Sequence, residues 1–131
     1  MSRDDACPFC HLPPGRVLRS STHARAIADA YPVADGHTLV VPVRHVASLF
    51  DLPVDELADV WRLVGEVRAA LAGSHEVDGF SIGVNDGEAA GQTVGHAHVH
   101  IIPRRRGDVA DPRGGVRWVI PDRAPYWEPD R

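Results

Sequence analysis

The apolar residues of this chain follow two periodicities, which together predict an α+β fold. Four short stretches bounded by glycine, proline or polar residues are typical of strands, and one of them contains the apolar, β-branched run Thr38–Val41. These stretches are Val17–Ser21, His23–Ala30, His37–Val43 and Phe80–Asn85. A fifth strand carries alternating histidines and ends at Pro103. We expect the five strands to form one antiparallel sheet.

The segment from Pro53 to Ala72 has the 3.6-residue period of an amphipathic helix instead. Proline suits the first helical position, and the acidic residues Asp55 and Glu56 complement the helix dipole just after it. Gly73 predicts the end of the helix. The apolar stripe that we expect to pack on the sheet consists of Leu57, Val60, Trp61, Val64, Val67 and Leu71.

Length and charge narrow the class of protein. A chain of 131 residues suits one domain, and a net charge of −4 argues against a broad nucleic-acid-binding surface. No apolar run approaches the ~20 residues that cross a membrane, and no apolar segment follows the N-terminus as in a signal peptide. The prediction is therefore a cytoplasmic protein with neither a nucleic-acid nor a membrane partner.

Composition divides the chain at about residue 107. We expect a domain over residues 1–107 and a tail over residues 108–131, where proline, glycine and charged residues dominate. The tail is expected to pack on the domain or on a dimer partner. Trp118, Tyr126 and Trp127 are the side chains that we expect to anchor it, and Trp118 or Trp127 is expected to influence substrate choice.

Three histidines, His96, His98 and His100, alternate with apolar residues. On a strand they share one face, so the row suggests either a metal site or a nucleophilic site. Neighbours in such a row are ~6.5 Å apart, so two can share a metal but a third strains to reach it. A neutral imidazole attacks phosphorus well when a hydrogen bond fixes its tautomer. The nucleophilic interpretation explains more of the surrounding sequence.

The loop before these histidines has the chemistry of a phosphate site. Gly87 and Gly91 allow backbone N–H groups to approach an anion, and Asn85, Gln92 and Thr93 offer neutral donors. The chain has no lysine and no Walker spacing, so it does not contain a P-loop.

The motif His96-Ala-His-Val-His-Ile-Ile102 resembles the signature of the histidine triad (HIT) superfamily. The resemblance extends through Asn85–Val94, Asp35–His45 and Asp51-Leu52, and so covers most of residues 7–103. It implies a five-stranded antiparallel sheet with one main packed helix, and a homodimer.

The resemblance also implies roles for individual residues. His98 would attack the α-phosphorus of a nucleotide and form a covalent nucleotidyl-histidine, which water then hydrolyses to a nucleoside monophosphate. His100 would bind the phosphate, His37 would support the triad and Thr93 would assist the leaving group. The remaining nucleotide contacts would be Asp29 to the ribose, Asn85 to the phosphate, and the backbone of Gly91, Gln92, Thr93 and Val94 around it.

Cys7 and Cys10 form a C-x-x-C motif followed by His11. Haem attachment would normally need export, and a thioredoxin-like role needs a βαβ context, so half of a tetrahedral Zn²⁺ site is favoured. The resemblance implies His45 and His96 as the other ligands. His11 is the rival fourth ligand, and two free thiols are the alternative to zinc.

The leading functional prediction is a nucleotidyl hydrolase or transferase that acts at the α-phosphorus of a purine nucleotide derivative, such as the dinucleoside polyphosphate diadenosine tetraphosphate. The segment Gly91-Gln-Thr-Val94 resembles the fragile histidine triad branch, whereas Asn85 resembles the nucleotide-binding, phosphoramidase branch. A nucleoside phosphoramidase is therefore one alternative. A nucleotide-binding regulatory module without turnover and a purely structural metal-binding protein are the others.

Overall fold

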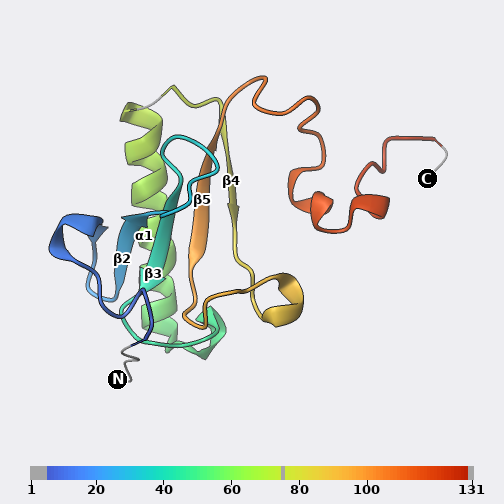
Figure 1. Ribbon diagram of the computed structural model, residues 1–131. Coiled ribbons are helices and arrows are strands. Elements are labelled where there is room, and N and C mark those ends of the chain that lie inside the picture. Colours follow the sequence, from blue (N-terminus) through green and yellow to red (C-terminus); the bar gives the residue numbers. More distant parts are fainter. Residues whose placement is uncertain (1–5, 75, 130–131) are drawn as a thin grey trace.

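The computed structural model, which describes residues 6–74 and 76–129, confirms the α+β prediction. Five strands form one antiparallel sheet in the order β1-β2-β3-β5-β4 (Figure 1). The strands are β1 (Val17–Ser20), β2 (Ala24–Ala28), β3 (Thr38–Pro42), β4 (Gly79–Gly83) and β5 (Val99–Arg104). Because β3 and β5 are neighbours, residues that follow β3 lie close to residues that precede β5.

Helix α1 (Val54–Ser74) contacts β2, β3 and β5 and encloses the main core with them. Val60, Val64, Val67 and Leu71 are buried as predicted, together with Leu63. Trp61 was placed wrongly on the buried stripe, because it lies 100° around the helix from Val60 and is 43% exposed.

The predicted end of the helix at Gly73 is also wrong, since α1 continues to Ser74. The hydroxyl of Ser74 donates to the carbonyl of Ala70 at 2.8 Å, which satisfies one acceptor in this last turn. One glycine near the end of a long helix costs too little to stop it.

The histidine strand begins later than its sequence pattern predicts. Strand β5 starts at Val99, so only His100 lies in it, while His96 and His98 lie in the segment just before, where residues 94–96 form a bend. That segment is held from another direction, because the N–H of Ala97 donates to the carbonyl of Val46 at 2.8 Å. This bond joins the approach to β5 to the segment that follows β3.

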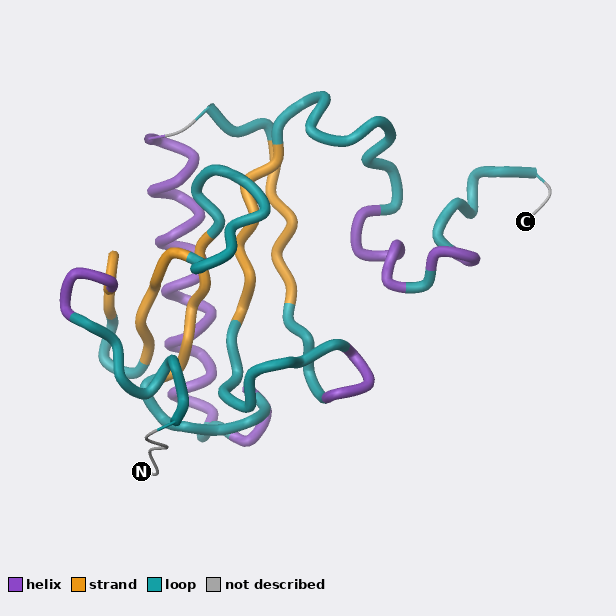
Figure 2. The backbone as a smooth tube through the Cα atoms, viewed as in Figure 1, coloured by secondary structure: helices purple, strands orange, loops and turns teal. Residues whose placement is uncertain are grey.

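The segments around the sheet carry short 3-10 turns. These are η1 (Pro14–Arg16), η2 (Leu49–Asp51), η3 (Glu88–Ala90), η4 (Gly115–Val119) and η5 (Pro121–Arg123). Figure 2 shows the C-terminal tail leaving the end of β5 and running outward past β4. Within the described ranges, no helix combines the length and the hydrophobicity needed to cross a bilayer.

Candidate functional site

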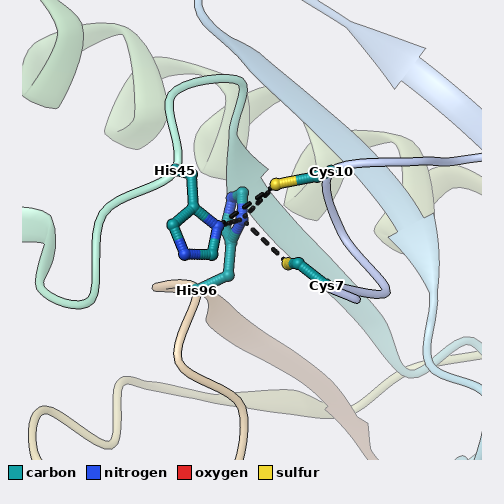
Figure 3. A group of neighbouring side chains, drawn as sticks. All are labelled: Cys7, Cys10, His45 and His96. Carbon is teal, nitrogen blue, oxygen red and sulfur yellow. Dashed lines mark hydrogen bonds between the residues drawn. The ribbon is translucent and has the colours of Figure 1, made fainter. Parts of the chain in front are cut away.

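Four side chains from three segments converge at one end of the sheet (Figure 3). Cys7 and Cys10 come from the N-terminal loop, His45 follows β3, and His96 precedes β5. The Nδ1 atoms of His45 and His96 lie 3.1 Å apart, and the Cys10 sulfur lies 3.1 Å from the first and 3.6 Å from the second. The Cys7 sulfur lies 3.3 Å from His96 Nδ1.

These separations fit a tetrahedral metal site with two sulfur and two nitrogen ligands. Atoms bound to one tetrahedral zinc at ordinary bond lengths lie about 3.4 to 3.8 Å apart, close to the values here. His96 is ready to bind, because its Nε2–H donates to the carbonyl of Pro42 at 2.8 Å and leaves the Nδ1 lone pair facing the sulfurs. Burial raises the pKa of the Cys7 thiol, so an arriving zinc ion must displace its proton.

The rival ligand His11 is not part of this group among the described residues, and it is exposed. The group of four is the one that the resemblance implies. Its residues are suited to hold a zinc ion, which would join the N-terminal loop to the segments that follow β3 and precede β5.

His98 has the opposite tautomer from His96. Its Nδ1–H donates to the backbone carbonyl of His96 at 2.9 Å, so its Nε2 carries a lone pair and no hydrogen. The ring is buried and packs edge-on against Phe9 and His100, at centroid distances of 5.3 and 5.1 Å. A carbonyl on one nitrogen and packing on two sides hold this imidazole as a nucleophile must be held.

His37 and His100 form a chain of hydrogen bonds with Asp29. The backbone N–H of Val33 donates to His37 Nδ1 at 3.2 Å, so the hydrogen of His37 is on Nε2. That Nε2 lies 3.0 Å from His100 Nδ1 and 3.3 Å from a carboxylate oxygen of Asp29, and both are acceptors. His100 Nδ1 therefore carries a lone pair, and His100 Nε2 carries a hydrogen that it can donate.

The imidazole rings of His37 and His100 are both neutral near pH 7. Burial lowers the pKa of His37 against the opposing charge of Asp29. Burial also lowers the pKa of His100, with help from the neighbouring rings of His98 and His37. A neutral His100 offers a single directed N–H donor, which suits an anionic phosphate oxygen.

The spacing of Asp29, His37 and His100 would also accommodate a second metal ion. The tautomer argues against that interpretation. A metal at this point would need the lone pair of His37 on Nε2, whereas the N–H of Val33 keeps that lone pair on Nδ1. The group is better described as a set of hydrogen-bonded side chains that orients His100.

The predicted phosphate loop is built as its glycines suggest, with one difference. Gly87 and Gly91 have positive φ angles of 97° and 96°, which only glycine adopts readily. The Gln92 side chain, however, is engaged with the loop itself. Its NH₂ donates to the carbonyls of Ala47 (2.8 Å) and Val94 (3.0 Å), and its oxygen accepts from the Gly87 N–H at 2.9 Å. Gln92 therefore shapes the loop. The backbone N–H groups of Gly91 and Gln92 also donate within it, to the carbonyls of Glu88 (2.9 Å) and Gly87 (3.2 Å), so Thr93 and Val94 are the backbone donors that we expect to face a ligand.

The predicted nucleotide contacts fall into two hollows. A cavity of about 330 Å³ contains His37, His100 and Asn85. Gly91, Gln92, Thr93 and Val94 line a neighbouring hollow with Ala47 and Gly87. Asp29 lies beside the first of these through its contact with His37.

Several groups that fix the site were not predicted. The carbonyls of Pro42 and His96 and the N–H of Val33 set three histidine tautomers, but backbone groups leave no trace in the residue types. Phe9 lies within the C-x-x-C motif and packs on both His96 and His98, at centroid distances of 5.8 and 5.3 Å. An aromatic residue inside a metal-binding loop was the available signal.

Comparison with known proteins identifies one family. Residues 13–107 match the HIT domain, so Cys7 and Cys10 lie before the matched segment. The chain is 39% identical over 119 residues to the nitrilase and fragile histidine triad fusion protein NitFhit of Caenorhabditis elegans, covering 91% of this chain and 27% of that protein. It is 38% identical over 104 residues to the asymmetrical bis(5'-nucleosyl)-tetraphosphatase of Schizosaccharomyces pombe, covering 79% of this chain and 57% of the relative.

One solved structure bears on the metal. A zinc-bound histidine triad family protein from Mycobacterium smegmatis superposes with a TM-score of 0.69 at 38% identity, covering 81% of this chain and 80% of the other. The chain thus spans most of this relative but only about a quarter of the fusion protein and just over half of the tetraphosphatase.

Proposed function

Because this chain belongs to the HIT family, we propose that it is a nucleotidyl hydrolase acting at the α-phosphorus of a purine nucleotide derivative. The observation that carries the proposal is that neighbouring groups fix the tautomers of all three alternating histidines. His96 presents a lone pair to the sulfurs, His98 has a lone pair on Nε2 for attack, and His100 has a hydrogen on Nε2 to donate. Residues 96–100 thus provide a metal ligand, a nucleophile and a hydrogen-bond donor in the proposed mechanism.

The proposed reaction has two displacements at phosphorus. His98 Nε2 forms a bond to the α-phosphorus while the bond from phosphorus to the leaving group breaks and the leaving group departs with that electron pair. Water then attacks the same phosphorus, the P–N bond breaks, and a nucleoside monophosphate is released. His100 Nε2–H and the backbone N–H groups of Thr93 and Val94 would stabilise the phosphoryl oxygens, and the Thr93 side chain would assist the leaving group.

We further propose that Cys7, Cys10, His45 and His96 hold a structural zinc ion. Their two-sulfur, two-nitrogen set and burial support zinc, as does the name of the zinc-bound relative from M. smegmatis. The ion would add rigidity to the segment whose carbonyl orients His98.

Two leaving groups fit the same reaction. The name of the S. pombe relative supports a dinucleoside polyphosphate, from which a nucleotide leaves. Asn85, which lines the cavity beside His100, is the residue that favoured the phosphoramidase alternative, in which an amine leaves.

The decisive test is His98→Asn, which removes the nucleophilic nitrogen. Release of AMP from diadenosine tetraphosphate and from adenosine 5′-phosphoramidate should fall by at least about 10³-fold, a typical loss for a covalent nucleophile. Zinc content should not change, because His98 is outside the group of four. His23→Asn, a half-buried histidine away from the site, is the matched control and should retain activity.

Mass spectrometry of quenched wild-type enzyme should locate an AMP adduct on the peptide containing His98. Failure of the zinc-loaded wild type to release AMP from either substrate would overturn the proposed hydrolase. That result would favour a nucleotide-binding module without turnover, which equilibrium binding of AMP would then reveal.

A further inference from the structure

The phosphate loop, residues 86–94, is joined to the rest of the domain through one glutamine side chain. Most of the loop is exposed, and only Gln92 and Val94 are half-buried. Its backbone hydrogen bonds, such as the one from the Ala90 N–H to the carbonyl of Gly87 at 3.1 Å, close the loop on itself. Among the described residues, the hydrogen bond that links this loop to the domain runs from the Gln92 side chain to the carbonyl of Ala47.

The partners of the Gln92 amide fix its orientation. Its NH₂ group donates to the carbonyls of Ala47 at 2.8 Å and Val94 at 3.0 Å, and its oxygen accepts from the N–H of Gly87 at 2.9 Å. A carbonyl can only accept and a backbone N–H can only donate, so these three partners permit one orientation of the amide. Both amide hydrogens are engaged, and the side chain has none left to donate to a substrate.

The carbonyl that holds Gln92 is next to the one that holds the start of the histidine row. Ala47 accepts from the Gln92 side chain, and its neighbour Val46 accepts from the N–H of Ala97, both at 2.8 Å. The bend at residues 94–96 lies between these two attachments. Both ends of the bend are therefore fastened to consecutive carbonyls of the segment that follows β3.

This arrangement sets the position of the backbone donors relative to the nucleophile. Thr93 and Val94 follow the first attachment, and His98 follows the second. Donors fixed in place stabilise the charge on phosphoryl oxygens in the transition state without having to reorganise. A displacement of about 1 Å in such a site can cost about 10²-fold in rate. Without the Gln92 side chain, the exposed loop that carries these donors would lose its hydrogen bond to the domain.

We propose that Gln92 is a positioning residue of the proposed hydrolase, on which this inference rests. Its side chain holds the N–H groups of Thr93 and Val94 at a fixed distance from His98 and does not itself bind the substrate. The role differs from the nucleotide contact that the sequence predicts for Gln92. Because the side chain acts through the placement of other groups, its loss should reduce kcat far more than it weakens nucleotide binding.

Two substitutions in the full-length protein test this role. Gln92→Leu removes all three hydrogen bonds, and kcat for AMP release from diadenosine tetraphosphate should fall by about 10²-fold. KM, and the Kd of AMP measured by calorimetry, should change by less than about fivefold. Gln92→Glu keeps the size of the side chain and the bond from Gly87, but a carboxylate cannot donate to the carbonyls of Ala47 and Val94. Its kcat at pH 7.5 should fall to a similar extent.

Asp86→Leu is the matched control, because Asp86 is an exposed residue of the same loop that lines neither hollow, and its kcat should stay within about twofold of wild type. Urea unfolding identifies the variants that remain folded, and Gln92→Glu provides the comparison if Gln92→Leu does not fold. A wild-type kcat in either Gln92 variant, or a KM and AMP Kd that rise as much as kcat falls, would overturn the inference and leave the hydrolase standing. A wild type that releases no AMP would instead contradict the hydrolase itself.

Discussion

The neutral tautomer of three histidines in the site is set, in each case, by one neighbouring backbone group. The carbonyl of Pro42 faces His96, the carbonyl of His96 faces His98, and the N–H of Val33 faces His37. A carbonyl can only accept and an N–H can only donate, so each contact permits one neutral tautomer. Chemically equal side chains thereby differ: His96 has its lone pair on Nδ1, His98 has its lone pair on Nε2, and His37 has its hydrogen on Nε2.

The buried, neutral state of His37 predicts how stability depends on pH. Burial lowers its pKa in the folded state below the ordinary value of 6.5. Above about pH 6.5 the ring is neutral whether the chain is folded or not. As the pH falls through 6.5 the unfolded chain takes up the proton first, so the free energy of unfolding decreases until the folded pKa is reached.

Urea unfolding at pH 7.5 and 5.5, with zinc saturating, measures this effect in wild type and His37→Gln. The decrease between the two pH values should be smaller in the variant by up to about 1.4 kcal/mol, the most that one such group contributes over this range. An equal decrease in both proteins would show that His37 is protonated in the fold. His23→Gln should keep the wild-type decrease.

At the scale of elements, one carboxylate fastens α1 to the turn between β1 and β2. Asp59 is buried on the helix and accepts from the hydroxyl of Ser21 at 2.7 Å and the N–H of His23 at 2.8 Å, and it also pairs with Arg62. These contacts, the Ser21 bond above all, lower the pKa of Asp59 to about 2. The helix is thus positioned by a polar contact as well as by its apolar stripe.

Asp59→Asn should lower the free energy of unfolding by about 2 kcal/mol, a usual value for hydrogen bonds to a charged group. The stabilisation from the charge is complete above the ordinary pKa of 3.8 and is lost as the pH falls from 3.8 towards 2. Chemical denaturation at pH 7 measures the loss. Glu66→Gln, an exposed acid on the same helix, should change stability by only a few tenths of a kcal/mol. Equal effects of the two substitutions would contradict this role for Asp59.

The sequence predicted the sheet and helix well because their signals are local. Side-chain periodicity identified all five strands and the helix, and no boundary moved by more than three residues. The start of β5 at Val99 was missed because pairing with β3 and β4 decides where a strand begins, and the histidine alternation continues outside it. Trp61 was misplaced because a residue at the edge of an apolar stripe can face either way.

For the candidate site, sequence identified which residues gather but not how they are tuned. The zinc candidates meet as the resemblance implied, from positions separated by as many as 89 residues. The Gln92 side chain is hydrogen-bonded within its own loop. The tail residues that line the cavity beside His100 are valines rather than the expected tryptophans. Both outcomes depend on long-range packing, which residue types alone do not encode.

At the scale of the whole molecule, the four candidate zinc ligands bring the N-terminal loop to the end of β3 and the start of β5. That loop forms a second apolar cluster with β2 and β3, containing Cys7, Phe9, Cys10 and Ile27. Phe9 in turn supports the His98 ring. Loss of zinc should therefore weaken the fold and misplace the nucleophile together.

Replacing Cys7 and Cys10 by serine tests this connection. The purified wild type should contain one zinc ion per chain, and the double variant should contain none, with a melting temperature lower by several degrees, because metal binding energy contributes directly to folding. Elemental analysis and calorimetry measure the two quantities. His11→Ala should retain both zinc and stability, because that exposed residue is outside the group of four.

AMP release separates a zinc ion that positions His98 from one that only stabilises the fold. In the positioning case, kcat should fall in C7S/C10S well below its melting temperature, while KM for the nucleotide changes little. The proposed nucleotide contacts are Asp29 after β2, Asn85 after β4, His100 on β5 and the loop at residues 91–94, all outside the N-terminal loop. Unchanged kcat in a zinc-free variant that remains folded would show that the carbonyl of His96 holds His98 without help from the metal. The same variant therefore decides whether metal binding at His96 also controls the position of His98.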